Sequence, residues 1–329
     1  MGTIHFLNVN EGDCIWVQDD QQGNTIIDVC NARIEEQEDE QSNILTETCS
    51  ASVPGNYRQK EHPVNPIEYF KERNMDEIFR FILTHPDMDH MDGIKDLFDT
   101  FDVINFWDTS NNKEMESDTS WGKYREEDWE FYQTIRKSEK NPKVLNLYSG
   151  ATGQYYNRDE NGNSTESKFN ILSPTKELVE EANKSKDYND ASYVILYKVN
   201  NMRIIFAGDS SDKTWDYILE NYHDDVKNID ILCAPHHGRK SGGNDNYLDV
   251  LNPKLTLFGN AKSKDLDYSS WNNRNLEFIT NNQANCVILD TGTKNKIKVY
   301  VTYEKFAKAK NEFSFYSTKH KAWYIETIE

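Results

Sequence analysis

Three short polar clusters of this chain carry the residue types that bind metal ions. The candidate metal ligands are His85, Asp87, Asp89, His90, Asp209, His236 and His237. Neutral imidazole nitrogens and carboxylate oxygens form the ligand set that suits zinc, manganese or iron. The clusters therefore predict a metal site and the hydrolytic chemistry that such a site supports.

The first cluster spans residues 85–90 and reads HPDMDH, which places four potential ligands in six residues. One turn of this kind can present His85 and Asp87 on one side and Asp89 and His90 on the other, so that it serves two ions. Asp209 could then bridge the two ions. A pair of ions about 3.5–4 Å apart lowers the pKa of a shared water and holds both the attacking and the leaving oxygen.

Each cluster alone has a more ordinary explanation. An Asp-His pair in a loop is usually a hydrogen-bonded turn, a Gly-Asp pair is common at strand ends, and a His-His-Gly run is only suggestive. However, all three clusters directly follow hydrophobic runs that predict strands, at residues 78–84, 202–207 and 229–234. Because a rigid scaffold positions the loops at strand ends, we expect one composite site at one rim of a sheet.

The remaining elements follow from the periodicity of apolar residues. Residues 3–9, 14–18 and 25–29 predict a β-meander that ends at Asp28. Helices are expected at residues 66–74, 126–137 and 213–222, and another is expected to begin at residue 93. Further strands are expected at residues 101–107, 144–148, 169–172, 191–197, 254–258, 286–290, 297–302 and 322–327. Residues 31–63 read as a long polar loop. Helices separating groups of strands predict a layered α/β architecture.

Composition narrows the class of protein. The 329 residues carry a formal net charge of -19. This charge argues mildly against a large nucleic-acid interface, although two divalent cations or a local basic patch would offset it. The five cysteines are widely spaced and form no CxxC pair, which indicates small buried side chains. No apolar run has the length of a membrane span, and the N-terminus lacks the pattern of a secretory signal, so a cytoplasmic protein is expected.

Residues 84–93, THPDMDHMDG, resemble the HxHxDH motif of the metallo-β-lactamase fold in its HxDxDH form, which is typical of the hydrolase domain of ComEC-type competence proteins. Other segments resemble this branch in the same order. They are the opening strand and GxGD-like turn at residues 6–13, the aspartate Asp28 after the meander, the N-x-x-S segment at 189–192, the bridging Asp209, the HHG motif at 234–238 and a turn at 289–292. The resemblance extends from about residue 3 to about residue 302.

The resemblance implies an αββα four-layer sandwich that hydrolyses its substrate with a metal-bound hydroxide. The first metal would take His85, Asp87 and Asp209. The second metal would take Asp89, His90, Asp209 and one histidine of the HHG motif, either His236 or His237. The other histidine could hydrogen-bond the substrate or act as a general acid. Asp89 and His237 are the candidate catalytic residues.

Two departures from the family pattern bear on the metals, and a third bears on the substrate. Asp87 stands where most of the superfamily has histidine, so two divalent ions are expected with Zn²⁺ first and Mn²⁺ as the alternative. The further histidine that precedes the bridging aspartate is absent, and Asn189 or Asp190 lies nearest. The first metal would then bind weakly or only with substrate. Arg239 and Lys240 follow the HHG motif and could contact a phosphate, or they are two solvated loop cations.

The function expected from these features is that of a metal-dependent phosphodiesterase or nuclease acting on single strands or nucleotides. A lactonase or thioesterase of the same fold, and a non-catalytic binding protein, are the alternatives. Bases could stack on a group of aromatic residues of a kind that more often belongs to the core, namely Trp107, Trp121, Trp129 and Tyr132.

One domain is expected over residues 1–329, with an insertion at about 108–168 and a C-terminal extension at about 303–329. ComEC-type proteins carry the hydrolase domain beside a membrane channel, whereas no membrane segment is expected here. The segments 108–140 and 303–329 are therefore candidate surfaces for a separately encoded partner.

Overall fold

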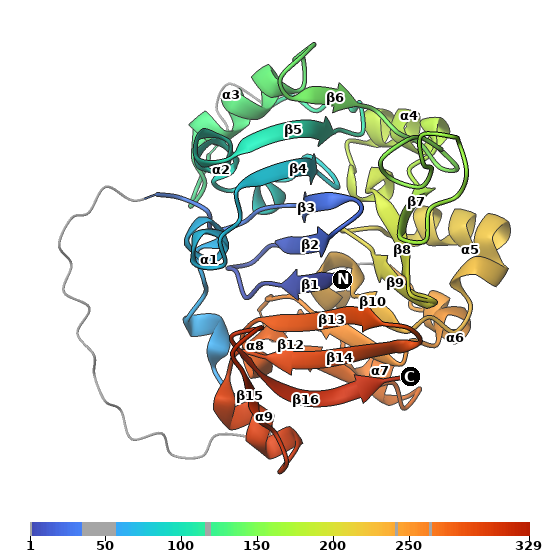
Figure 1. The fold of residues 1–329 in the computed structure, drawn as a ribbon. Coiled ribbons are helices and arrows are strands. Elements are labelled where there is room, and N and C mark those ends of the chain that lie inside the picture. Colours follow the sequence, from blue (N-terminus) through green and yellow to red (C-terminus); the bar gives the residue numbers. More distant parts are fainter. Residues whose placement is uncertain (1, 35–56, 116–119, 241–242, 263–264) are drawn as a thin grey trace.

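The computed structural model describes residues 2–34, 57–115, 120–240, 243–262 and 265–329, and these form two facing β-sheets (Figure 1). The large sheet has the order β15 (Tyr316–Ser317), β16 (Ala322–Ile328), β14 (Lys296–Val301), β13 (Val287–Thr293), β1 (Thr3–Phe6), β2 (Ile15–Asp19), β3 (Gly23–Ile27), β4 (Glu77–Ile82), β5 (Asp102–Trp107) and β6 (Lys143–Leu145). The small sheet has the order β12 (Phe278–Thr280), β11 (Leu255–Phe258), β10 (Ile231–Cys233), β9 (Met202–Phe206), β8 (Val194–Val199) and β7 (Lys168–Ser173).

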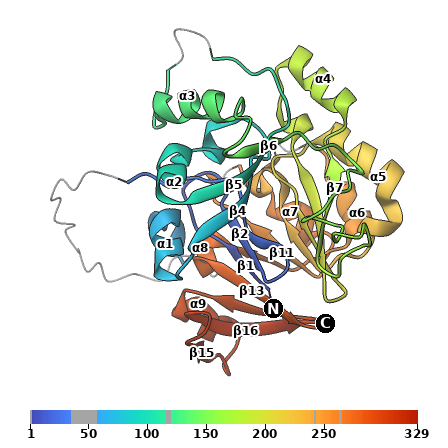
Figure 2. The ribbon, with the colours of Figure 1, turned by 45° about the horizontal axis from the view of Figure 1, so that its top comes forward.

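Helices cover the outer face of each sheet, as the turned view of Figure 2 shows. Those packed on the large sheet are α1 (Pro66–Glu72), α2 (Ile94–Thr100) and α3 (Glu126–Ile135), and those packed on the small sheet are α5 (Asp212–Val226), α6 (Tyr247–Leu251) and α7 (Tyr268–Asn272). The remaining helices are α4 (Lys176–Ser185), α8 (Asn281–Ala284) and α9 (Glu304–Lys310), and short 3-10 turns lie at η1 (Gln59–Glu61), η2 (Met88–His90), η3 (Asn189–Ala191) and η4 (Pro235–Gly238).

Alternation along the strands explains why the layers form. In β2, Ile15 and Val17 point into the apolar core between the two sheets, whereas Trp16 points to the core under α1. Successive side chains of a strand face opposite sides, so one strand serves both cores. The chain enters α1 through Asn65, whose side chain accepts hydrogen bonds from the first free backbone N–H groups of the helix.

Several sequence predictions can be compared with these elements. Trp107, Trp129 and Tyr132 are buried in the cores, and Trp121 packs against the core under the helices, so base stacking on the three buried rings is contradicted.

The described cysteines are buried and carry free thiols. Cys49 and the part of the predicted 31–63 loop at residues 35–56 lie outside the described residues. Among the described helices, none combines the length and apolar character that crossing a bilayer requires.

The predicted insertion and extension both add strands to the large sheet. Residues 108–168 include α3 and also β6, which pairs in parallel with β5. Residues 303–329 include α9, β15 and β16, and β16 pairs with β14. These segments are therefore joined to the sheet by backbone hydrogen bonds.

We expect His5 to make stability depend on pH. Its ring is buried against Trp16 and hydrogen-bonds to Tyr69, with 2.9 Å between Nδ1 and the phenol oxygen. Burial, with smaller contributions from nearby positive groups, lowers the pKa of His5 from 6.5 to about 3. Between these values the unfolded chain binds a proton that the folded chain does not, so stability falls as the pH falls from 6.5 towards 3.

Between pH 7.5 and pH 5, the free energy of unfolding of the wild type should drop by about 2 kcal/mol more than that of His5→Gln. Urea unfolding in the presence of a chelator measures this difference. His223→Gln is the matched control, because His223 is exposed. Equal pH slopes for the wild type and His5→Gln would contradict the assignment.

Candidate metal centre

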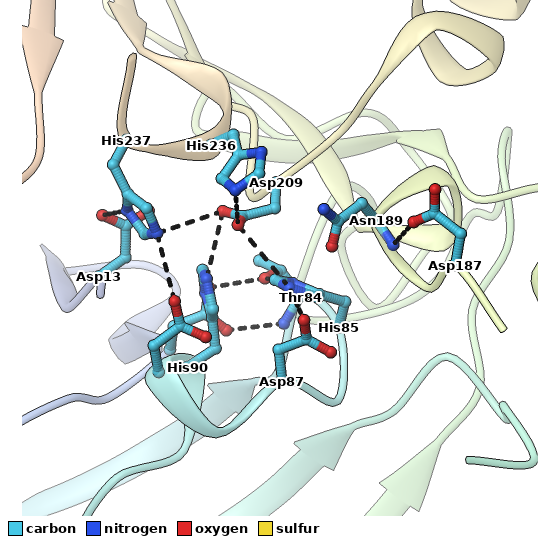
Figure 3. A network of polar contacts seen from close by, with 12 residues as sticks. Asp13, Thr84, His85, Asp87, His90, Asp187, Asn189, Asp209, His236 and His237 are labelled. Atoms are coloured by element: carbon cyan, nitrogen blue, oxygen red, sulfur yellow. Dashed lines mark hydrogen bonds and ion pairs between the residues drawn. The ribbon is translucent and has the colours of Figure 1, made fainter. Parts of the chain in front are cut away.

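The polar clusters lie where strands of both sheets end. The cluster at residues 85–90 follows β4 of the large sheet, Asp209 follows β9, and the His236-His237 pair lies in η4 directly after β10 of the small sheet. Figure 3 shows the labelled side chains of this set pointing toward one another, namely those of His85, Asp87, His90, Asp209, His236 and His237. The structure thus brings together at one rim the side chains that the sequence offers as ligands.

One set of four side chains, which we call the second group, consists of Asp89, His90, Asp209 and His237. The Nε2 atom of His90 lies 3.2 Å from Oδ1 of Asp209, and Nε2 of His237 lies 3.6 Å from the same oxygen and 3.7 Å from Oδ2 of Asp89. The ligands of a tetrahedral ion bound at about 2.1 Å lie about 3.4 Å apart. The spacing of the second group is therefore that of a metal site.

A more open set, the first group, consists of His85, Asp87, Asp209 and His236. The Nε2 atom of His85 lies 3.7 Å from Oδ2 of Asp87 and 3.9 Å from Oδ2 of Asp209. The Nε2 atom of His236 lies 3.5 Å from that same Asp209 oxygen. Asp209 thus turns one carboxylate oxygen to each group, which is the arrangement that a bridging ligand requires.

Buried atoms without partners support metal binding at both groups. Within the described residues, Nε2 of His85, His90 and His237 and Oδ1 of Asp209 are buried and have no hydrogen-bond partner. A buried polar atom left unsatisfied costs about 1–3 kcal/mol. Three of these atoms belong to the second group, and one, Nε2 of His85, belongs to the first. The described ligand atoms that lie within 4.8 Å of one another include the sets His85, His90 and Asp209 and Asp89, His90 and His237, but no set with Asp87 or His236. The residues present therefore fit a divalent metal ion.

The rings are oriented by hydrogen bonds on their far sides. The Nδ1 atom of His90 lies 2.8 Å from the Asp28 carboxylate, and Nδ1 of His237 lies 3.0 Å from the Asp13 carboxylate. Asp28 also accepts hydrogen bonds from the backbone N–H and the hydroxyl of Thr84, at 2.7 and 2.6 Å. Carboxylates in these positions keep the proton on Nδ1 and leave Nε2 free to bind a metal.

The backbone of the HHG motif is held in an uncommon conformation. His236, His237 and Gly238 all have positive φ angles, of 49°, 57° and 84°. A side chain at Gly238 would place its Cβ atom 2.0 Å from the Phe258 ring, so only glycine fits there. Left-handed conformations at non-glycine residues are sparsely populated and cluster at functional sites. Here they split the two histidines, so that each ring faces a different group.

The carboxylates give the centre a strongly negative potential. Burial opposes a charge on the His90 ring, yet Asp209 and Asp28 raise the pKa of His90 well above its ordinary value. Burial likewise opposes a charge on His237, but Asp209 and Asp13 raise its pKa to about 10. The carboxylates therefore hold positive charge on these rings when no other cation is near, and metal ions would replace it.

Asn189 and Asp190, the two residues that could complete the first group, differ in position. The Asp190 carboxylate accepts a hydrogen bond from Ser211 and lies 3.7 Å from Lys213, so it is engaged at the start of α5. Asn189 donates its backbone N–H to Asp187, and Figure 3 shows its side-chain amide directed toward Asp209. His236 is nearer, because its ring contacts Asp209 directly.

Sequence reasoning missed one residue of the centre. The ammonium group of Lys113 contacts Oδ1 of Asp87, and the Lys113 side chain is mostly buried. Lys113 lies 26 residues from Asp87 in a polar segment, and no motif marks it. The roles expected for Asp13 and Asp28 were confined to a turn and a strand end, although both carboxylates bind the histidine rings.

No model of a known protein family matches this chain, and no curated protein matches it. Several solved structures do match. A protein described as a metal-dependent hydrolase from Parabacteroides distasonis is 13% identical with a TM-score of 0.42, and the match covers 85% of this chain and 93% of that chain. A diphosphatase of the PhnP family is 12% identical with a TM-score of 0.40, and the match covers 85% and 94%.

The diiron β-hydroxylase CmlA from Streptomyces venezuelae is 13% identical with a TM-score of 0.39, and the match covers 78% of this chain but 44% of CmlA, so this chain spans less than half of CmlA. Metallo-β-lactamases are also among the matching structures. Identities and TM-scores this low describe a likeness in general chain path and not in substrate. The α/β fold with αββα layers that the sequence predicts is confirmed by the two facing sheets and their outer helices.

Proposed function

We propose that this chain is a metal-dependent phosphodiesterase of the ComEC-like branch, with a binuclear centre. The observation that carries the proposal is the pair of four-residue groups that share Asp209 and direct buried, unpartnered atoms at two points. Two divalent ions, Zn²⁺ with Mn²⁺ as the alternative, would activate a water and stabilise negative charge on the substrate. Each of the two HHG histidines then serves one ion, with His236 in the first group and His237 in the second.

Cationic side chains beside the first group favour a phosphate ester over a neutral substrate. The Lys113 ammonium contacts Asp87 on one side. On the other side Arg239 follows the HHG motif, and its charge helps to lower the pKa of His236, an effect led by burial of the ring. Among the described residues, the Arg239 Nε atom is buried and has no hydrogen-bond partner. A guanidinium donor of this kind suits a phosphate oxygen.

The residues of the centre have different roles in the proposed reaction. Asp209 holds the two groups together, and Asp89 with His237 forms the more enclosed side of the centre. Asp13 and Asp28 fix the histidine rings. A single strand or a nucleotide fits the net charge of -19 better than a long duplex, because only a few phosphates need to approach the centre.

Metal removal tests this proposal. Purified protein is treated with a chelator, its metal content is measured, and it is reloaded with Zn²⁺ or Mn²⁺. Hydrolysis of bis(p-nitrophenyl) phosphate and of a single-stranded oligonucleotide should fall to background without metal and return with it. A lactone and a thioester, which lack the phosphate charge, should be hydrolysed poorly under the same conditions.

The panel also separates the alternatives. Hydrolysis of the lactone or thioester without hydrolysis of either phosphodiester would assign the chain to another hydrolase class. Protein that binds neither ion and hydrolyses nothing would contradict the enzymatic proposal as a whole.

A further inference from the structure

The two groups differ in the charges that surround them. In the second group, the buried carboxylates of Asp28 and Asp13 lie behind the rings of His90 and His237. In the first group, the one described hydrogen-bond partner of His85 Nδ1 is the neutral hydroxyl of Thr84, at 3.1 Å. The second group therefore presents more negative charge to a cation than the first group does.

Lys113 increases this difference. Its ammonium contacts Oδ1 of Asp87, the carboxylate that belongs to the first group alone, and leaves Oδ2 directed at His85. A carboxylate that already binds an ammonium offers less negative charge to a metal ion, and the ammonium itself repels that ion. Asp87 is also the more open ligand, since its side chain is 37% exposed while that of Asp209 is 4% exposed.

Contacts with α3 fix the position of Lys113 from one side. The backbone N–H of Lys113 donates to Oδ1 of Asn111 at 3.0 Å, and the Asn111 amide donates to the Tyr132 hydroxyl at 2.9 Å. Tyr132 and Arg136 in turn bind the buried carboxylate of Asp108, at 2.7 and 2.9 Å. These contacts fix the segment that carries Lys113.

Contacts with a second helix hold the same segment from the other side. The backbone N–H of Asn112 donates to the Asn183 side chain of α4 at 2.8 Å, and the Tyr188 hydroxyl lies 3.1 Å from the Asn112 carbonyl oxygen Oδ1. The Lys113 ammonium lies 5.5 Å from the centre of the Tyr188 ring. Lys113 is thus not a freely mobile surface lysine, because both its backbone and its side chain are anchored beside Asp87.

We propose that Lys113 is a built-in counter-ion that makes the two metal groups unequal: the second group binds its ion tightly, and the first group binds its ion weakly because Lys113 occupies one oxygen of Asp87. This inference rests on the binuclear centre of the proposed function. It assigns Lys113 as a positioning residue that acts through Asp87 on metal occupancy.

Calorimetric titration of the metal-free protein with Zn²⁺ alone measures the two affinities. In the wild type, the first ion should bind at least about 100-fold more tightly than the second, and Lys113→Met should tighten the second step by roughly 10-fold or more while leaving the first step nearly unchanged. Lys113→Arg keeps the charge and should retain the unequal steps. His237→Ala should remove the tight step, and His85→Ala should remove the weak one.

Lys198→Met is the matched control, because Lys198 pairs with the exposed Asp225 and its loss should change neither step. Circular dichroism and a Lys113→Gln variant exclude misfolding as the cause of a change. Two equal steps in the wild type, or a second step that neither Lys113→Met nor Lys113→Gln tightens, would overturn the inference. Unequal steps that respond to Lys113 in a protein inactive on phosphodiesters would contradict only the proposed substrate.

Discussion

Asp209→Asn is expected to abolish binding of both metal ions and to lower phosphodiester hydrolysis roughly a thousandfold, which corresponds to about 4 kcal/mol of transition-state stabilisation. Asp209 supplies one oxygen to His90 and His237 of the second group and the other oxygen to His85 and His236 of the first. Asparagine has the same shape but replaces one oxygen with an N–H donor and removes the negative charge.

Single-group variants make the prediction specific. His237→Ala should remove the ion of the second group and His236→Ala that of the first, so each should bind one ion per chain when the metal content is measured at saturating Zn²⁺. Only Asp209→Asn should leave none. Asp225→Asn is the matched control, because Asp225 is an exposed carboxylate paired with Lys198. Retention of two ions by Asp209→Asn would show that Asp209 does not bridge the groups.

The strands that position the centre are readable from the sequence because each is a short apolar run that ends at polar residues. The runs at residues 78–84, 202–207 and 229–234 correspond to β4, β9 and β10, and their ends differ by at most two residues. Such runs carry their own signal, since burial on one or both faces dictates the residue types. The layer order followed from the resemblance and agrees with the cores on both sides of each sheet.

Other elements could not be predicted from the sequence, and the reasons are physical. Helices α6, α7 and α8 have four or five residues, which is too short for a helical period to appear. Helix α4 is different, because Thr175 caps its first turn and Leu178, Val179 and Ala182 form its buried face. That signal is present in the sequence, although the predicted elements do not include this helix. The pairing of β16 with β14 depends on contacts between strands, which a single-sequence pattern does not encode.

The centre itself was only partly predictable. Residue types identified the histidines and aspartates, but the division of His236 and His237 between two groups depends on their left-handed backbone. Lys113 reaches Asp87 only because the Asp108 and Tyr132 network fixes its segment. Contacts of this kind join residues far apart in the chain, so no local spacing of residues in the sequence predicts them.

The second large effect is expected at Asp28, which orients the second group without binding a metal. Asp28 is buried and holds three donors in place: the backbone N–H of Thr84, the Thr84 hydroxyl and the His90 ring. Its φ angle of 56° is one that asparagine also tolerates, so Asp28→Asn changes the chemistry with little change in backbone preference.

In Asp28→Asn the amide nitrogen can only donate. If it replaces Oδ2, the Thr84 hydroxyl and Nδ1–H of His90 both lose their acceptor, because both bind that oxygen. The His90 proton then moves to Nε2, the atom that must bind the metal. We expect the ion of the second group to bind roughly 10–100-fold more weakly. Stability of the metal-free protein should fall by about 1–3 kcal/mol, because a buried donor is left unsatisfied.

Asp13→Asn is the comparison that separates the two effects. The Asp13 carboxylate also lies behind a histidine of the second group, and its one side-chain hydrogen bond within the described residues is to His237. Asp13→Asn should therefore weaken metal binding in the same way as Asp28→Asn but lower the free energy of unfolding by less. Calorimetric Zn²⁺ titration and urea unfolding in chelator measure the two quantities. Unchanged affinity of the tight step in both variants would show that these carboxylates do not set the ligand tautomers, and that the second group binds its ion without their help.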